Sequence, residues 1–220
     1  MKLFSYLRSS LHTSPVRAFE YDQLSHKKFN GKVLDLGGGK KAGYTSHLHG
    51  TVEITSVNID KAVEPTIVHD LSQPLPFSAD SFDSAISFNT FEHLKDIETP
   101  LGETFRVLKN GGTVTLITPF LKEIHASPDD YWRPTESAWR YLLTKNGFEH
   151  VTVVPLGLGL FTARYGLIYG PLPRIMRPLF ALCSYVLDSL LLRWPRYKRM
   201  CGAHIYPLAY LVTAAKPKAL

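Results

Sequence analysis

The sequence predicts an α/β fold in which helices cover both faces of a mostly parallel β-sheet. Apolar, β-branched runs alternate with stretches of helical periodicity along most of the chain. The first run, Val33 to Leu36, leads directly into Gly37, Gly38 and Gly39. Glycines at this place allow a tight turn and leave no side chain in the way of a ligand. A strand that ends in such a turn and leads into a helix forms a nucleotide-type pocket at the carboxyl edge of a sheet.

The elements of the first half of the chain are recognised by runs that end in or near an acid. We expect strands at 33–36, 52–60, 66–70 and 84–88, and a short helix at 42–49. Two of these strands end in Asp60 and Asp70. A carboxylate at the carboxyl end of a strand can accept hydrogen bonds from a bound ligand.

The second half continues the alternation. We expect helices at 98–109 and 135–146, and strands at 113–118, 148–155 and 204–214. Asn110, Gly111 and Gly112 should end the first helix, because these residues tolerate left-handed backbone. Thr135 is suited to cap the second helix. Pro207 has no N–H to donate to a sheet, which slightly weakens the prediction of the last strand.

Composition limits the class of protein. The chain has 220 residues, of which 45% are hydrophobic and 20% charged, as expected for one soluble domain with extensions. Its two cysteines, Cys183 and Cys201, form no disulfide framework and no metal-ligand spacing, which favours a reducing, cytoplasmic setting. No apolar run reaches the roughly 18 residues of a membrane span.

Charge divides the chain unevenly. Residues 156–220 hold nine Lys and Arg and one acid, Asp188, whereas the remainder holds 16 basic and 18 acidic residues. We therefore expect an anionic partner for the carboxy-terminal part and not for the rest. The predicted organisation is a helical cover at 1–30, a core at 31–155, an apolar and basic insertion at 156–200, and a final strand within 201–220.

The glycine turn by itself leaves two cofactors open. Gly37, Gly39 and Ala42 fit the dinucleotide pattern G-x-G-x-x-G/A, and Asp35, Gly37 and Gly39 fit the D-x-G-x-G turn that binds S-adenosylmethionine. Asp60 follows Gly39 by 21 residues, where an acid can accept both ribose hydroxyls of an adenosine cofactor. A nicotinamide oxidoreductase and a methyltransferase share this arrangement.

The downstream segments carry a specific resemblance. In chain order they read VLDLGGG, VNID, HDLSQPLPF, SFDSAISFNTFEHL and FRVLKNGGTVTLITP. This series resembles the class I S-adenosylmethionine-dependent methyltransferases, and most closely the small-molecule group called type 11, over about residues 30–155. The resemblance implies a Rossmann-like, seven-stranded, mostly parallel sheet with helices on both faces and an antiparallel last strand.

The resemblance also implies cofactor contacts. Asp35, Gly37, Gly38 and Gly39 would contact the methionine part of S-adenosylmethionine, Asp60 the ribose, Asp70 and the backbone of Leu71 the adenine, and Asn89 the methionine side. One position departs from the family, because Lys41 replaces the third glycine of its turn. The alternative to methyl transfer is therefore a non-catalytic protein that binds S-adenosylmethionine, and a nicotinamide oxidoreductase is less favoured.

The acceptor side has fewer markers. The expected activity is methyl transfer to a small-molecule, lipid or glycan-precursor acceptor. A general base is needed only for a hydroxyl or ammonium acceptor, and His93 and His125 are the candidates. Tyr131 and Arg133 lie in the loop at 125–135, where they either contact the acceptor or, with Asp130, brace the loop.

The insertion at 156–200 suggests contact with a membrane surface. Its segment 178–192 is largely apolar and lies between Arg177 and Arg193. Fifteen helical residues extend about 22 Å, short of the roughly 30 Å hydrocarbon core, so the segment is expected to lie in the interface of an anionic membrane. The alternatives are a lid or a dimer face, and nucleic acid is a less favoured partner.

Overall fold

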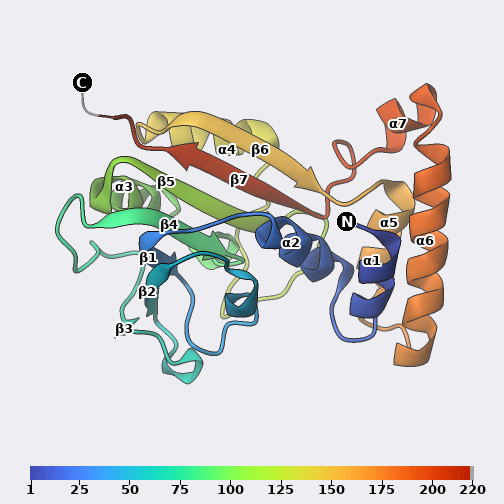
Figure 1. The fold of residues 1–220 in the computed structure, drawn as a ribbon, viewed down its shortest axis with the longest axis horizontal. Coiled ribbons are helices and arrows are strands. Elements are labelled where there is room, and N and C mark those ends of the chain that lie inside the picture. Colours follow the sequence, from blue (N-terminus) through green and yellow to red (C-terminus); the bar gives the residue numbers. More distant parts are fainter. Residues whose placement is uncertain (219–220) are drawn as a thin grey trace. The chain divides into compact units, whose positions relative to one another are not determined.

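The fold is built on a seven-stranded sheet. The computed structural model describes residues 1–218, and within them the strands have the order β3-β2-β1-β4-β5-β7-β6 (Figure 1). The strands are β1 (Gly31–Leu36), β2 (Val52–Asn58), β3 (Ile67–Val68), β4 (Phe82–Phe88), β5 (Leu108–Pro119), β6 (Glu149–Leu156) and β7 (Ala209–Ala215). The five strands from β3 to β5 pair in parallel. Strand β7 runs against its neighbours (Figure 1), which confirms the predicted fold class.

Helices flank the sheet and complete the chain. The α-helices are α1 (Leu3–Ser9), α2 (Pro15–Ser25), α3 (Glu98–Val107), α4 (Glu136–Lys145), α5 (Leu160–Ile168), α6 (Arg177–Leu191) and α7 (Pro195–Cys201). Four short 3₁₀ turns are η1 (Thr45–His47), η2 (Lys61–Val63), η3 (Phe91–His93) and η4 (Arg174–Met176). Thr135 caps α4 as predicted, because its hydroxyl accepts from Ala138 N.

The chain folds as two compact units. The helical unit comprises residues 1–26, 119–124 and 155–210, and the sheet unit comprises residues 27–118, 125–154 and those from 211 onward. Each unit has buried apolar residues of its own, including Tyr6 in the helical unit and Leu34 in the sheet unit.

The core of the sheet unit explains why the central strands read as continuous apolar runs. Leu34 of β1 pairs with Ala85 of β4, and neither side chain is exposed. A central parallel strand is covered on both faces, so its residues do not alternate between apolar and polar. The chain runs from β1 outward to β3 and returns to β4 on the other side of β1. This reversal opens a crevice at the carboxyl ends of β1 and β4.

Two segments differ from the prediction for local reasons. The helix expected at 42–49 is reduced to the 3₁₀ turn η1, since Gly43 and Thr45 are weak helix formers and Tyr44 turns inward to Asp35. Strand β5 begins at Leu108, before the residues expected to end a helix. Gly111, at φ 77°, lets the strand bend there and still donate to Lys216 O.

The helical unit is organised around an aromatic cluster. The Tyr6 ring of α1 lies 5.4 Å from that of Phe19, 6.5 Å from that of Tyr165 and 5.7 Å from that of Tyr185, measured between centroids. Offset and edge contacts of this kind stabilise a core beyond its buried area. Burial raises the pKa of Tyr6, so its hydroxyl stays neutral.

Helix α6 carries its one acid on its buried side. Asp188 is fully buried and accepts from Thr162 N at 2.8 Å, Phe161 N at 3.2 Å and Tyr197 Oη at 3.0 Å. The first N–H groups of a helix have no intrahelical partner, and a carboxylate there also meets the positive end of the helix dipole. Asp188 therefore fixes α5 to α6 and α7.

Candidate active site

A cavity of about 590 Å³ lies at the carboxyl ends of the parallel strands. Every strand from β1 to β5 contributes a loop to it, which is the crevice expected where the strand order reverses. Its lining residues are Gly37, Asn58, Ile59, Asp60, Val63, Asp70, Leu71, Ser72, Asn89, Thr90, His93, Leu94, Lys95, Ser127, Pro128, Asp129 and Tyr131. The set includes seven predicted site residues: Gly37, Asp60, Asp70, Leu71, Asn89, His93 and Tyr131.

Gly37 forms the floor of the cavity and needs to be glycine. Its φ is 88°, and a Cβ placed on it would lie 2.1 Å from Thr90 Oγ1. Its carbonyl accepts from Asn58 Nδ2 at 2.6 Å, and Asn58 Oδ1 in turn accepts from Asp60 N at 2.9 Å. Asn58 thus couples the glycine turn to the acidic end of β2. We did not predict this residue, although it precedes Asp60 in the quoted VNID segment.

Two carboxylates are held at the edge of the cavity by their own loops. Asp60 Oδ1 accepts from Ala62 N at 2.8 Å, and Asp70 Oδ1 accepts from Ser72 N at 2.9 Å. Ile59, 65% exposed, adds an apolar wall beside them. Acceptor-only groups suit a ribose diol and an adenine amino group, and an apolar wall suits a purine ring. The hydrogen-bond acceptors and the apolar wall of the cavity therefore fit an adenosine cofactor.

Lys41, the departure from the family turn, pairs outside the cavity lining. Its Nζ lies 2.9 Å from Glu64 Oε1 and donates to Ala62 O at 3.3 Å. The backbone N–H groups of Lys40 and Lys41 also donate to carbonyls of residues 64 and 63. The lysine connects the glycine turn to the loop after β2, so the side chain that stands in place of the third glycine does not obstruct the cavity.

Asp35 lies behind the glycine turn, not on the cavity wall. Its side chain is buried, and Tyr44 Oη lies 2.8 Å from each carboxylate oxygen. Burial raises the pKa of Asp35 to about 7, an effect that the Tyr44 hydrogen bond partly offsets. A Cβ on Gly38 would lie 1.9 Å from Asp35 Oδ2, and one on Gly39 would lie 2.2 Å from Val63 O. Close packing therefore accounts for Gly38 and Gly39, and their predicted cofactor contacts stay predictions.

The loop at 125–135 is braced from within. Arg133 forms a two-point ion pair with Asp130, with Nη2 to Oδ2 at 2.6 Å, and Asp130 Oδ2 also accepts from His125 N at 3.0 Å. The hydrogen bond from Arg133 holds the pKa of Asp130 well below its usual range. Of the two uses predicted for this loop, Arg133 thus shows the bracing contacts, whereas Tyr131 lines the cavity.

The same loop is fastened to the segment after β4. The carbonyl of Glu92 accepts from Tyr131 N at 2.7 Å and from Trp132 N at 3.3 Å, and Trp132 Nε1 donates to Leu94 O at 2.7 Å. His93 Nδ1 lies 2.7 Å from Asp129 O. These contacts hold His93 and Tyr131 on one side of the cavity as part of a single ordered surface.

Both predicted histidines meet an acid that the sequence reading did not select. Glu92 Oε1 lies 3.8 Å from His93 Nε2 and 3.6 Å from His125 Nε2. The two imidazole centroids are 5.1 Å apart. Glu92 stands next to His93 in the quoted segment, but its inward direction depends on the η3 turn and is not visible from spacing alone.

Comparison with known proteins decides between the two adenosine cofactors. Residues 34–116 match the family model described as a methyltransferase domain. The matched part of the chain is a methyltransferase domain. The match covers the glycine turn, the acidic ends of β2 and β3, and the segment with His93, and it confirms the resemblance. This family depends on S-adenosylmethionine as its methyl donor, which confirms the predicted cofactor.

Curated relatives share part of their length with this domain. The chain is 30% identical over 174 residues to 2-methyl-6-phytyl-1,4-hydroquinone methyltransferase, chloroplastic, from Arabidopsis thaliana, covering 70% of this chain and 50% of the relative. It is 28% identical over 161 residues to the corresponding enzyme 1 of Oryza sativa subsp. japonica, covering 63% of this chain and 48% of the relative. The chain thus spans about half the length of these relatives.

Solved structures share the fold. A phosphoethanolamine N-methyltransferase 2 from Haemonchus contortus, solved in complex with S-adenosyl-L-methionine, gives a TM-score of 0.59 at 17% identity, over 98% of this chain and 57% of that one. An S-adenosylmethionine-dependent methyltransferase from Thermotoga maritima, described as a possible histamine N-methyltransferase, gives 0.59 at 15% identity, over 96% of this chain and 94% of that one. Both likenesses support the methyltransferase fold.

Proposed function

We propose that this protein transfers a methyl group from S-adenosylmethionine to an amphiphilic acceptor bound at the side of the cavity formed by Asn89, His93 and Tyr131. The observation that carries the proposal is the lining of a single cavity. The carboxylates of Asp60 and Asp70, which suit the adenosine of the donor, lie at one side, and polar groups of the loop at 125–135 lie at the other. The bound donor supplies an electrophilic methyl group.

The residues of the cavity mainly bind the donor and the acceptor, orient them and exclude water. Asp60 and Asp70 hold the donor through its ribose and adenine, and Gly37 and Asn89 lie where its methionine part is expected. No protein nucleophile is needed for a direct displacement, so the rate depends on holding the acceptor atom within about 3 Å of the methyl group. His93 and His125 are the catalytic groups we propose at the reacting atom of the acceptor, and Tyr131 contacts the rest of it.

The proposed acceptor is a lipid or a lipid-linked small molecule. Two observations support this class over a freely soluble one. The curated relatives are named for a hydroquinone that carries a phytyl chain. The helical unit also presents a large apolar surface next to basic side chains, as described below.

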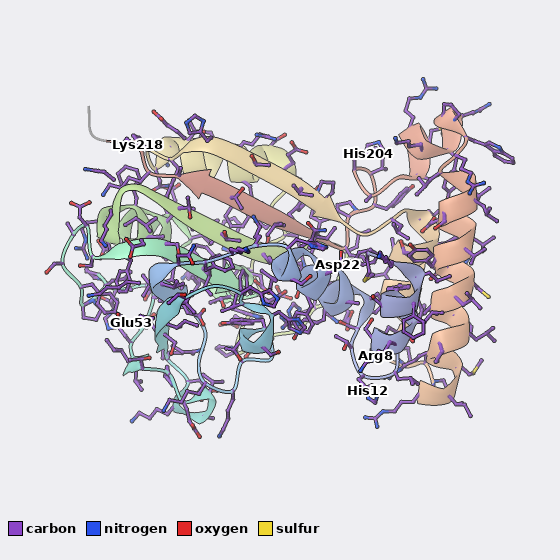
Figure 2. All side chains as sticks on the ribbon, in the orientation of Figure 1. Arg8, His12, Asp22, Glu53, His204 and Lys218 are labelled. Atoms are coloured by element: carbon purple, nitrogen blue, oxygen red, sulfur yellow. The ribbon has the colours of Figure 1, made fainter. Side chains whose placement is uncertain are left out.

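That surface lies on one side of α6. The outward residues recur at helical spacing, and Figure 2 shows side chains projecting from the side of α6 that faces away from α1 and α5. The exposed apolar members are Ile175, Leu179, Leu182, Leu187, Leu190 and Trp194. Ile175 is 88% exposed and Trp194 is 66% exposed, and an exposed group of apolar residues of this kind is typical of an interaction surface. We call these six residues the α6 outer surface.

Cations frame this surface. Arg174 stands before α6, and Arg193, Arg196, Lys198 and Arg199 follow it, all of them exposed. The combination of apolar residues, an interfacial tryptophan and flanking cations suits a helix that lies in the headgroup region of an anionic bilayer. Within residues 1–218, no helix has both the length and the apolar character to cross a membrane. We propose that the protein works in the cytoplasm at such a membrane surface.

Transfer of an isotopically labelled methyl group tests the proposed function. The protein is incubated with labelled S-adenosylmethionine and a lipid extract, and mass spectrometry identifies any compound that gains the label. We expect label in an organic-soluble product, lost in Asp60→Ala and retained in Glu53→Ala, an exposed acid on β2 (Figure 2). Binding of the donor without any labelled product would instead indicate the non-catalytic alternative.

A further inference from the structure

We propose that Glu92, His93 and His125 form a binding site for a divalent transition-metal ion at the acceptor side of the cavity. One ligand atom from each residue lies within 4.8 Å of the other two, so the three can surround a single ion. Metal bonds to imidazole nitrogen and carboxylate oxygen are about 2.0–2.2 Å long. An ion between Glu92 Oε1 and the two Nε2 atoms, 3.8 and 3.6 Å away, would lie close to that distance from all three.

The carboxylate of Glu92 indicates that the site is built for a cation. Its side chain is 0% exposed, and within residues 1–218 neither of its oxygens has a hydrogen-bond partner. A buried carboxylate without hydrogen bonds is costly to keep. The two imidazole nitrogens, at 3.6 and 3.8 Å, are beyond hydrogen-bond distance. A bound cation would replace the missing partners.

The tautomer of His93 points in the same direction. Its Nδ1 lies 2.7 Å from Asp129 O, and a carbonyl only accepts, so Nδ1 carries the hydrogen. In the neutral ring, Nε2 then presents its lone pair toward the Glu92 carboxylate. Two electron-rich atoms face each other, and a metal ion between them turns this repulsion into coordination.

The second histidine is oriented by the ion pair of Asp130 and Arg133. His125 Nδ1 lies 3.3 Å from Asp130 Oδ2 and 3.5 Å from Arg133 Nη2, and Asp130 is itself held by Arg133. Metal-binding histidines commonly donate their other ring N–H to a carbonyl or a carboxylate, which fixes the ring for coordination. His93 with Asp129 O reproduces the carbonyl version of this arrangement, and the Asp130–Arg133 ion pair fixes the ring of His125.

A site with two histidines and one carboxylate leaves coordination positions open. Sites of this composition hold zinc or iron and bind water or a substrate at the remaining positions. His93 lines the cavity beside Asn89, so an open position would face the acceptor. The ligand we infer is an oxygen of the acceptor, such as a hydroxyl or phenol group, so the two histidines would act on the reacting atom through the bound ion. This role rests on the proposed function, whereas metal binding itself does not.

Metal titration tests the site without donor or acceptor. Chelator-treated protein is titrated with Zn²⁺ by calorimetry and with Co²⁺ by visible absorption. We expect one tight equivalent and Co²⁺ bands in the visible range. Loss of one ligand in Glu92→Gln, His93→Ala or His125→Ala should weaken Zn²⁺ binding by at least about 100-fold, more than loss of an outer partner.

The matched control is His26→Ala, which removes an exposed histidine from the carboxyl end of α2 and should leave the tight site unchanged. Should Glu92→Gln fail to fold, as circular dichroism would show, His125→Ala still tests the site because its side chain is 32% exposed. The proposal is overturned if the wild type binds no tight equivalent, or if folded ligand variants bind Zn²⁺ as the wild type does. Tight binding without methyl transfer would overturn the proposed function alone.

Discussion

At the scale of single residues, the Asp60 carboxylate caps a turn of the chain and has a proposed second use in binding the cofactor. One oxygen caps the η2 turn through Ala62 N, and the side chain lines the cavity. In Asp60→Ala we expect S-adenosylmethionine to bind about 2–4 kcal/mol more weakly, since two charge-assisted hydrogen bonds to the ribose are lost. Calorimetry measures the change.

Asp60→Asn separates the two uses. The amide oxygen can keep the cap, so the loop should retain its stability while donor affinity still falls. Glu53→Ala serves as the exposed acidic control on the same strand. Unchanged affinity in Asp60→Ala, with the fold intact, would remove Asp60 from the proposed binding site.

Asp35 makes stability depend on pH in an unusual direction. Its pKa is raised to about 7 in the folded protein, compared with about 3.9 in an unfolded chain, so the folded state binds the extra proton between these values. Stability due to this group is therefore greatest at low pH and falls by up to about 1.4 kcal/mol per pH unit as pH rises toward 7.

Asp35→Asn should remove that slope. Urea unfolding at pH 5 and pH 6.5 should show the variant gaining stability relative to the wild type as the pH rises. Glu53→Gln, a change at an exposed acid, corrects for the other titrating groups. A constant difference between wild type and Asp35→Asn at both pH values would contradict the raised pKa.

At the scale of elements, α6 differs from the usual amphipathic helix, in which apolar residues face the core and charged residues face water. Asp188 lies on the buried side, where it binds the first turn of α5, and the apolar residues of the α6 outer surface lie in solvent. Inside the unit, three hydrogen bonds to the carboxylate offset part of the cost of its burial. The arrangement leaves apolar side chains exposed, and this exposure is the basis of the membrane contact proposed above.

Flotation with vesicles tests the environment proposed for that side. We expect co-flotation with vesicles of phosphatidylglycerol and phosphatidylcholine and much less with phosphatidylcholine alone. The pair Arg196→Glu and Arg199→Glu should weaken binding by at least about 2 kcal/mol, because each cation near an anionic surface adds about 1 kcal/mol. Added salt should have the same effect.

The control for flotation reverses two exposed lysines of the sheet unit, Lys32→Glu and Lys61→Glu, and should bind vesicles as the wild type does. Equal loss in the control would indicate a general charge effect and not docking by α6. If the protein stays in the soluble fraction with every vesicle, docking by α6 is contradicted, and a lid or a dimer contact becomes the better explanation of the α6 outer surface.

At the scale of the whole molecule, the two units should respond differently to the donor. All residues that line the cavity belong to the sheet unit. Hydrogen exchange followed by mass spectrometry should therefore show slower exchange with S-adenosylmethionine in peptides covering 58–63, 70–72 and 89–95, and little change across α6.

NADH is the informative control ligand in the exchange experiment. NADH carries the same adenosine. At the concentration at which S-adenosylmethionine saturates the protein, we expect NADH to leave hydrogen exchange in the three cavity segments unchanged. Protection of the three cavity segments by NADH, and none by S-adenosylmethionine, would restore the nicotinamide alternative.

The sequence alone determined the fold class, the family and several of the residues that line the cavity. These features depend on local patterns. Apolar runs mark buried parallel strands, and the residues that follow such strands meet at one edge whatever the details of packing. Gly37, Asp60, Asp70 and Asn89 could be predicted for this reason, and the structure places all four on the cavity.

Only the tertiary structure decided which side chains meet across long distances in the chain. Glu92 and His125 are brought together by the loop that is fastened to η3, and spacing gives no sign of their contact. Asp35 is covered by Tyr44, which turns inward where the sequence predicted a helix. The physical reason is common to these cases: the role of a polar group depends on which partner shares its buried space, and that partner is chosen by packing, not by local pattern.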